Sequence, residues 1–245
     1  MNRPAPSSAR AAQPLLTVIV PAFNEGATIE RLLARVVAAP FDKQVVVVDD
    51  GSTDRTAQIL DRWHGQRGVQ VVRHAANRGK GHAIRTGLAL ARGRFTIIQD
   101  ADLEYDPGDY PRLIEPLLAG TAQAVFGSRY LAKKGTGPFS AFRCGVALLN
   151  LTVRLLYGAV LTDEATCYKV LPTHLWRRLD LQCERFEFCP EVTAKLCRLG
   201  IPIVETPVSY DPRGAQDGKK IRWRDGLAAL RELWRWRSWR QDGSC

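Results

Sequence analysis

Two aspartates separated by one residue, Asp100 and Asp102, follow the short apolar run 95–98. Carboxylates with this spacing, just past a buried strand, can both turn toward one point in a cleft. Carboxylate oxygens suit hard divalent cations, which are often held by one or two carboxylates together with the oxygens of a substrate diphosphate. The pair therefore predicts a metal-dependent enzyme that acts on a nucleotide. Because so short a motif is common by chance, the rest of the chain has to support it.

Two further polar clusters also follow apolar, β-branched runs. They are the segments 21–25 (PAFNE) and 49–52 (DDGS). Residues 52–54 are explained as the N-cap group of a helix, but two acids at a strand end, Asp49 and Asp50, are not. Since ligands of open α/β sheets bind beyond the carboxyl ends of the strands, we expect all three acidic clusters at one edge of a sheet.

The elements that must position these clusters alternate along the chain. Short runs rich in Val and Ile are followed by helical patterns, which is typical of βαβ units and of the α/β class, with a mostly parallel sheet and flanking helices. The predicted strands cover residues 17–20, 45–48, 69–72, 95–99 and 124–126. The predicted helices cover about 28–37, a segment starting near 54, and about 81–91. Uniformly apolar strands indicate that helices cover both faces of the sheet.

Length and composition set the protein class. The 245 residues are 45% hydrophobic, which suffices for the core of one α/β domain and excludes a disordered protein. The net charge of +10 favours an anionic partner: nucleic acid, an anionic membrane surface or a phosphorylated substrate. The six cysteines show no C-x-x-C spacing and the histidines no zinc-finger interval, which predicts reduced thiols in a cytoplasmic protein.

The chain divides into three parts. We expect a disordered arm at residues 1–14, which lack the apolar stretch of a signal peptide. The α/β domain is expected to cover 15–210, and a basic loop followed by a C-terminal amphipathic helix is expected to cover 211–245. Trp and Arg alternate within 224–240, a pattern typical of a peripheral membrane contact. The same pattern suits single-stranded nucleic acid, but no RNA-binding motif accompanies it, so we expect no nucleic-acid partner. Three leucines of this helix are expected in the core: Leu227, Leu230 and Leu233.

Eight motifs in a fixed order carry a family resemblance across about residues 16–228. They are VIVPAFNEGATI, VVVVDDGSTDRT, NRGKGHAIRTGLALARG, IIQDADLEYDP, VFGSRY, TDEATCYKVLP, RFEFCPEVTAKLCRLG and GKKIRWRDG. Together they resemble glycosyltransferase family 2, the nucleotide-diphospho-sugar transferases of the GT-A (Rossmann-like) fold. Within it the chain is most similar to the dolichyl- or polyprenyl-phosphate mannosyl- and glucosyltransferases. This resemblance implies inverting, metal-dependent transfer of a hexose from a donor of the GDP-mannose or UDP-glucose type to a polyprenyl or dolichyl phosphate.

The resemblance also implies a donor site. Glu25 and one of the pair Asp49 and Asp50 would hold the nucleoside, and the turn at 79–81 would bring backbone N–H groups to the diphosphate. Mg²⁺ or Mn²⁺ would be bound by Asp100 and Asp102, with Glu104 as a further carboxylate whose role stays open. The full set of implied donor-binding residues is Pro21, Phe23, Glu25, Asp49, Asp50, Lys80, Arg85, Asp100, Ala101, Lys219 and Arg222.

The nature of the acceptor decides whether a general base is needed. A lipid phosphate is largely dianionic at neutral pH and already nucleophilic, so it needs cations instead, and the resemblance implies Arg129 and Arg143 in that role. Asp102 and Arg129 are then the residues expected to carry catalysis. An open alternative is a hydroxyl acceptor, with Glu187 or Glu191 as base. A non-enzymatic alternative, suggested by the basic charge, is a nucleotide-sugar sensor or a nucleic-acid-binding module.

Overall fold

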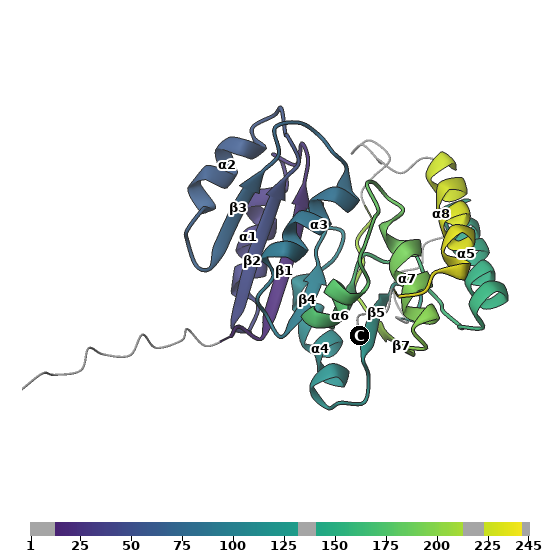
Figure 1. The fold of residues 1–245 in the computed structure, drawn as a ribbon. Coiled ribbons are helices and arrows are strands. Elements are labelled where there is room, and N and C mark those ends of the chain that lie inside the picture. The colour runs from purple at the N-terminus through teal and green to yellow at the C-terminus, as the bar shows by residue number, and fades with distance from the viewer. Residues whose placement is uncertain (1–12, 132–140, 213–222, 242–245) are drawn as a thin grey trace, which may run out of the picture.

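A seven-stranded mixed sheet forms the centre of the computed structural model, which describes residues 13–131, 141–212 and 223–241 (Figure 1). The strand order is β3-β2-β1-β4-β6-β5-β7, and only β6 runs antiparallel to its neighbours. The predicted α/β class and mostly parallel sheet are confirmed; β6 and β7 were not predicted. The strands are β1 (Leu16–Ala22), β2 (Lys43–Asp49), β3 (Val69–Arg73), β4 (Phe95–Ile98), β5 (Ala124–Ser128), β6 (Lys169–Pro172) and β7 (Ile203–Pro207).

Helices cover both faces of the sheet, as the uniformly apolar strands predict. Alternate residues of β1 enter different cores: Val18 and Val20 pack with α1, α2 and α4, whereas Ile19 packs with α3 and with the core that α5 to α8 share. The helices are α1 (Ile29–Ala38), α2 (Thr56–Trp63), α3 (Lys80–Leu90), α4 (Tyr110–Leu118), α5 (Ala141–Tyr157), α6 (Thr173–Arg178), α7 (Phe188–Arg198) and α8 (Trp223–Arg235), with 3₁₀ turns η1 (Pro107–Asp109) and η2 (Trp236–Ser238).

The last helix is packed into this fold. α8 contacts α5 and α7, and Leu233 and Trp236 are buried there. Figure 1 shows α5 and α8 next to each other on the side of the molecule opposite α2 and β3. No helix in the described part of the chain is long and apolar enough to cross a membrane.

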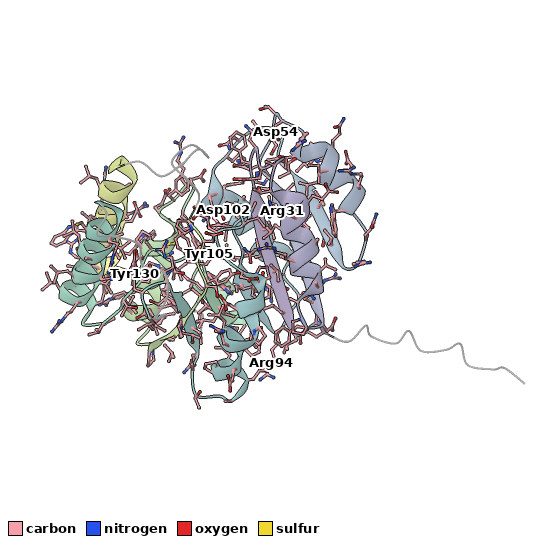
Figure 2. All side chains as sticks on the ribbon, turned by 180° about the vertical axis from the view of Figure 1, so that it is seen from behind. Arg31, Asp54, Arg94, Asp102, Tyr105 and Tyr130 are labelled. Carbon is pink, nitrogen blue, oxygen red and sulfur yellow. The ribbon has the colours of Figure 1, made fainter. Side chains whose placement is uncertain are left out.

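Strand register brings the acidic clusters to one edge. Ala22 of β1 pairs with Asp49 of β2, and Ile19 of β1 pairs with Ile98 of β4, so these strands end at similar heights. Figure 2 shows Asp54, which follows β2, and Arg94, which precedes β4, at opposite ends of the molecule with Asp102 between them. The loops after β1, β2 and β4 therefore surround one region.

The packing of α3 on β1 holds the start of α3 at this edge, and it depends on Gly87. A Cβ atom at Gly87 would lie 2.5 Å from Ile19 Cγ2, whereas one at Gly145 of α5 would meet nothing within 4 Å. We expect Gly87→Ala to lower the free energy of unfolding by about 1–3 kcal/mol through overpacking. Gly145→Ala should raise it by up to about 1 kcal/mol through helix propensity. Urea denaturation of the two variants checks this, and equal shifts of the same sign would contradict the packing argument.

Candidate active site

The loops after β1 and β2 form one unit. The backbone N–H of Asn24 donates to Ser52 Oγ at 3.0 Å, and Asn24 Oδ1 accepts the backbone N–H of Thr53 at 2.8 Å. The backbone N–H of Glu25 donates to Thr56 Oγ1 at 2.9 Å, and the Glu25 side chain is buried. The first two predicted donor-binding segments are thus held together. Pro21 lies within β1, and Phe23 is half-buried just beyond it.

The aspartates at the end of β2 are both buried but differ in their partners. Asp49 accepts the backbone N–H of Ser52 at 3.0 Å and lies 3.5 Å from Arg73 Nε. Asp50 accepts the backbone N–H groups of Arg78 at 3.0 Å and Gly79 at 2.7 Å. It also lies 2.7 Å from Nδ1 of His74. Asp50 therefore positions the loop that leads into α3.

That loop brings a cation to the aspartate pair. Lys80 Nζ lies 2.6 Å from Asp100 Oδ1. Burial is the largest single influence and lowers the pKa of Lys80, but the Asp100 carboxylate and the nearby Cys167 and Cys189 together outweigh it, so the pKa is raised and the ammonium stays charged. Gly79 precedes Lys80 with φ 98°, and a Cβ atom there would collide with the carbonyl oxygen of Glu184, so this turn requires glycine. Arg85, the other predicted donor cation, lies 3.4 Å from Glu184 Oε1 instead.

Gln99 fixes the backbone of the aspartate pair. Its fully buried Oε1 accepts hydroxyl protons from Tyr110 at 2.7 Å and Tyr168 at 2.6 Å. Its Nε2 donates to the carbonyl oxygen of Asp100 at 3.0 Å. Burial raises the pKa of each of these two tyrosines well above the usual range of a tyrosine, so both hydroxyls stay neutral and donate. Sequence reasoning did not identify Gln99.

The carboxylates at 100, 102 and 104 point to different partners. Asp102 Oδ1 accepts the backbone N–H of Glu104 at 3.1 Å, and Glu104 Oε2 accepts the hydroxyl of Tyr210 at 2.8 Å. Ala101 between the aspartates is buried. Figure 2 shows Asp102 close to Tyr105, whose backbone bridges to Tyr210. Glu104 thereby ties the aspartate loop to the segment after β7.

These residues fit a divalent cation shared with a ligand. Among the described residues, no three or more His, Cys, Asp or Glu side chains form a cluster that could hold a metal alone. Two carboxylates completed by substrate phosphates are, however, the usual arrangement for Mg²⁺ and similar ions. The Lys80 ammonium on Asp100 shows that this position already accommodates positive charge.

Arg129, at the end of β5, belongs to a buried ion pair. Its Nε and Nη2 donate to the two oxygens of Asp163 at 2.7 and 2.6 Å. The backbone N–H of Asp163 in turn donates to Glu205 of β7 at 2.9 Å. The Arg129 guanidinium lies 5.8 Å from the ring centroid of Tyr130, and Arg143 of α5 lies 5.5 Å from the same ring. The structure therefore brings the two predicted acceptor arginines to one tyrosine.

Asp163 and Lys169 were missed as site-supporting residues, although their motif was recognised. Lys169 is fully buried, donates to the carbonyl oxygen of Glu164 at 2.8 Å and lies 3.6 Å from the ring centroid of Phe126. Burial raises the pKa of Glu164, whose Oε2 has no partner within the described chain. The only available signal was the presence of charged residues inside an apolar segment.

The two glutamates considered as bases stabilise the turn before α7. Glu191 is buried and accepts the backbone N–H groups of Gln182 at 2.8 Å and Cys183 at 2.7 Å. It also lies 2.6 Å from Lys195 Nζ. Glu187 accepts two backbone N–H groups of the same turn, each at 3.0 Å. The predicted donor residues Lys219 and Arg222 lie outside the described residues.

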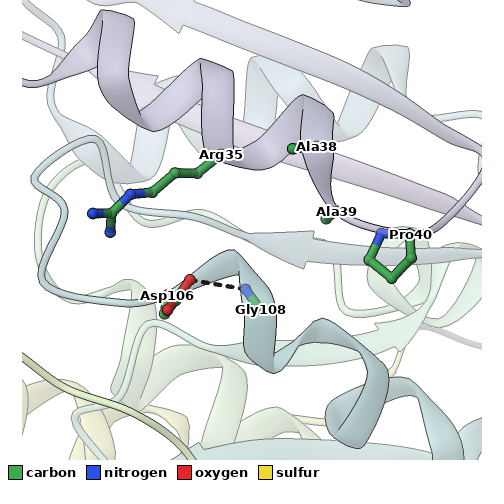
Figure 3. A pocket seen from close by; sticks show the side chains of 6 residues that line it. All are labelled: Arg35, Ala38, Ala39, Pro40, Asp106 and Gly108. Atoms are coloured by element: carbon green, nitrogen blue, oxygen red, sulfur yellow. Dashed lines mark hydrogen bonds between the residues drawn. The ribbon is translucent and has the colours of Figure 1, made fainter.

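A groove of about 360 Å³ lies away from these residues. It runs between the end of α1 and η1, and its lining is drawn in Figure 3: Arg35, Ala38, Ala39, Pro40, Asp106 and Gly108. Asp106 is already engaged there, since it accepts the backbone N–H of Gly108 at 2.9 Å. The groove brings together none of the predicted site residues.

Comparison with known proteins agrees with this geometry. The sequence model of the family described as glycosyl transferase family 2 matches residues 17–166. The low-salt glycan biosynthesis hexosyltransferase Agl6 of Haloferax volcanii is 30% identical over 205 residues, covering 82% of this chain and 48% of that protein. The undecaprenyl-phosphate 4-deoxy-4-formamido-L-arabinose transferase of Pseudomonas aeruginosa is 38% identical over 183 residues, covering 72% and 52%. The chain thus spans about half the length of these two curated relatives.

A solved structure confirms the fold. Glucosyl-3-phosphoglycerate synthase from Mycobacterium tuberculosis, in complex with Mn²⁺, UDP and phosphoglyceric acid, superposes with a TM-score of 0.69 at 21% identity. The match covers 93% of this chain and 80% of that one. The predicted GT-A fold is therefore confirmed.

The role of Gln99 predicts a specific pattern of stability. Gln99→Leu should lower the free energy of unfolding by about 2–4 kcal/mol, because two buried hydroxyls lose their acceptor. Adding Tyr110→Phe and Tyr168→Phe to that variant should restore most of the loss, since no buried donor is then left unpaired. Urea denaturation measures both variants. A triple variant less stable than Gln99→Leu would contradict this account.

The Lys80–Asp100 pair predicts a change in metal affinity. Lys80→Met should bind Mn²⁺ roughly tenfold more tightly in the absence of nucleotide, because the ammonium no longer neutralises the carboxylate. Arg85→Met, on the same helix but paired with Glu184, is the matched control and should change little. Free Mn²⁺ measured by electron paramagnetic resonance gives the affinities. Equal Mn²⁺ affinity of the wild type and Lys80→Met would rule out competition between the Lys80 ammonium and the ion for Asp100.

Proposed function

Because the chain belongs to glycosyl transferase family 2, we propose that it transfers a hexose from a nucleotide sugar to a polyprenyl phosphate. The undecaprenyl-phosphate arabinose transferase supports this acceptor class for the relatives. The observation that carries the proposal for this chain is the placement of Arg129 and Arg143 on the Tyr130 ring, at 5.8 and 5.5 Å. Asp163 neutralises and orients Arg129, so Arg143 adds the positive charge at this place that suits a phosphate group.

We assign the donor to the strand-end loops. Glu25 and Asp49 are proposed to accept hydrogen bonds from the nucleoside, since Asp50 already holds the loop into α3. The Lys80 ammonium at the start of α3 is proposed to receive the diphosphate, since charged donors bind phosphate oxygens strongly. The backbone N–H groups of the turn at 79–81 were expected in this role, but those of Gly79, Gly81 and the following His82 already donate to Asp50, Arg185 and Glu184. A donor of the GDP-mannose or UDP-glucose type fits this arrangement.

Asp100 and Asp102 are proposed to hold Mg²⁺ or Mn²⁺. When bound, the ion would neutralise the charge that develops on the departing nucleoside diphosphate. Glu104 is turned to the hydroxyl of Tyr210, and we therefore assign it to loop positioning rather than to the ion.

The acceptor is proposed to react without a general base. A phosphate oxygen of the acceptor forms the new bond to the anomeric carbon as the bond to the donor diphosphate breaks, with inversion. A dianionic phosphate has no proton to lose, whereas a hydroxyl does. The bonds of Glu191 to two backbone N–H groups and to Lys195 support this choice over a hydroxyl acceptor. Because the acceptor is a lipid, we propose that the protein works peripherally at the cytoplasmic surface of a membrane.

The test uses purified protein, Mn²⁺, a panel of nucleotide sugars and a polyprenyl phosphate, with the glycolipid detected by mass spectrometry. One donor should give product, and Asp102→Asn should lower kcat/KM roughly 10²- to 10³-fold, as loss of a charge-stabilising group does. Glu187→Gln is the control and should keep activity. The proposal fails if folded protein gives no product with any donor, or if Glu187→Gln is as damaging as Asp102→Asn.

A further inference from the structure

Helix α5 is apolar on two opposite sides. At about 3.6 residues per turn, positions 148, 151 and 155 form one stripe, and the buried residues form another on the far side of the helix. The outward stripe consists of Leu148, Leu151 and Leu155, which are 50%, 51% and 75% exposed. The core side consists of Val146, Leu149 and Val153. An ordinary surface helix carries polar residues on its outward side, so this stripe indicates a partner.

Helix α8 repeats the pattern with basic residues added. Its outward positions are Leu227, 57% exposed, the exposed Arg231, and Trp234, 56% exposed. The expectation that Leu227 lies in the core was wrong, because the core side of α8 is taken by Ala229 and Leu233. The guanidinium of Arg237 lies 4.0 Å from the Trp234 ring centroid.

The two stripes belong to neighbouring helices. α5 packs on α8 at the side of the molecule away from α2 (Figure 1). We call Leu148, Leu151, Leu155, Leu227, Arg231 and Trp234 the α5–α8 face. The sequence of α5 contains no acidic residue, and Glu232 of α8 is engaged by Arg235 at 3.4 Å and by Trp236 Nε1 at 2.9 Å. The face is therefore both apolar and positively charged.

The same helix reaches the acceptor side of the site. Arg143 lies near the start of α5 and stacks on Tyr130, which also contacts Arg129. A ligand whose phosphate lies at Arg143 is thus held at the end of the helix that carries the leucine stripe. Continuity between the stripe and the phosphate site favours one partner that offers both apolar and anionic groups.

We propose that the α5–α8 face docks on an anionic lipid bilayer. Leucine and indole side chains enter the interface, while Arg154, Arg231 and Arg237 meet lipid phosphates, which is how interfacial helices bind anionic membranes. The docking presents a lipid phosphate at the bilayer surface to Arg143 and Arg129. This last step rests on the proposed function, whereas the docking itself does not.

Vesicle flotation of the purified chain tests the docking. Vesicles of phosphatidylcholine with phosphatidylglycerol should carry the protein, pure phosphatidylcholine should carry less, and added salt should release it. The variant L148S/L151S/L155S should bind roughly 10- to 100-fold more weakly, since three partly inserted leucines are lost. Leu118→Ser, an exposed position of α4 on the other sheet face, is the matched control and should bind as wild type does. If the same fraction of the triple variant and of the wild type floats with the anionic vesicles, the proposal is overturned.

A transfer assay separates this proposal from the proposed function. With a water-soluble, short-chain isoprenyl phosphate, the triple variant should be as active as wild type; with a long-chain acceptor in vesicles it should be slower. Wild-type chain that floats but transfers to neither acceptor would refute the proposed function and leave docking supported. If the wild type is a dimer, the triple variant is a monomer and both float equally, the face would instead be an interface with a second copy of the chain.

The native thiol on the same stripe provides a readout without any substitution. Cys144 is exposed and precedes Leu148 by one turn of α5. Modification of the Cys144 peptide by a water-soluble maleimide, followed by mass spectrometry, should be slower in the presence of anionic vesicles. An unchanged rate would overturn the proposal.

Discussion

The carboxyl edge of the sheet gathers more negative charge than a partly buried surface can hold without partners, and the arrangement of the site follows from how that charge is balanced. Asp50 is balanced by backbone N–H groups, Asp100 by the ammonium of Lys80, and Asp163 by the guanidinium of Arg129. A buried carboxylate without such partners would cost several kcal/mol. Lys80 is the most consequential partner. The proposed metal ion would compete with the Lys80 ammonium for Asp100, and the proposed diphosphate would compete with Asp100 for the ammonium.

Neutral side chains join the proposed donor and acceptor halves of the site. Gln99 follows β4 and accepts from Tyr168, which precedes β6. Tyr105 and Tyr210 are bridged, and both rings lie near the Arg129 guanidinium, at 5.9 and 5.1 Å. These contacts set the spacing between the aspartate pair and the arginines without adding charge. The Glu104 carboxylate, which accepts the hydroxyl of Tyr210, is the charged exception among these contacts.

The sequence was informative wherever one local pattern decides the outcome. Uniformly valine-rich runs predicted the central strands, and polar residues after them predicted the edge where Lys80 meets Asp100. Prediction failed where partners are distant or burial breaks the pattern. Arg129 and Asp163 are 34 positions apart, and Gln99 and Tyr168 are 69 apart. The fully buried Lys169 starts β6, which hid that strand, and Leu227 looks like a core residue until the faces of α8 are known.

We propose that arginines hold the acceptor phosphate and that the reaction needs no general base. The most direct measurement offers the protein an isoprenyl phosphate and the matching isoprenyl alcohol together, with nucleotide sugar and Mn²⁺. We expect only the glycosyl phosphodiester, with its formation lost when Arg143 is replaced by Gln. Formation of the alkyl glycoside from the alcohol would show instead that the site activates a hydroxyl through a general base.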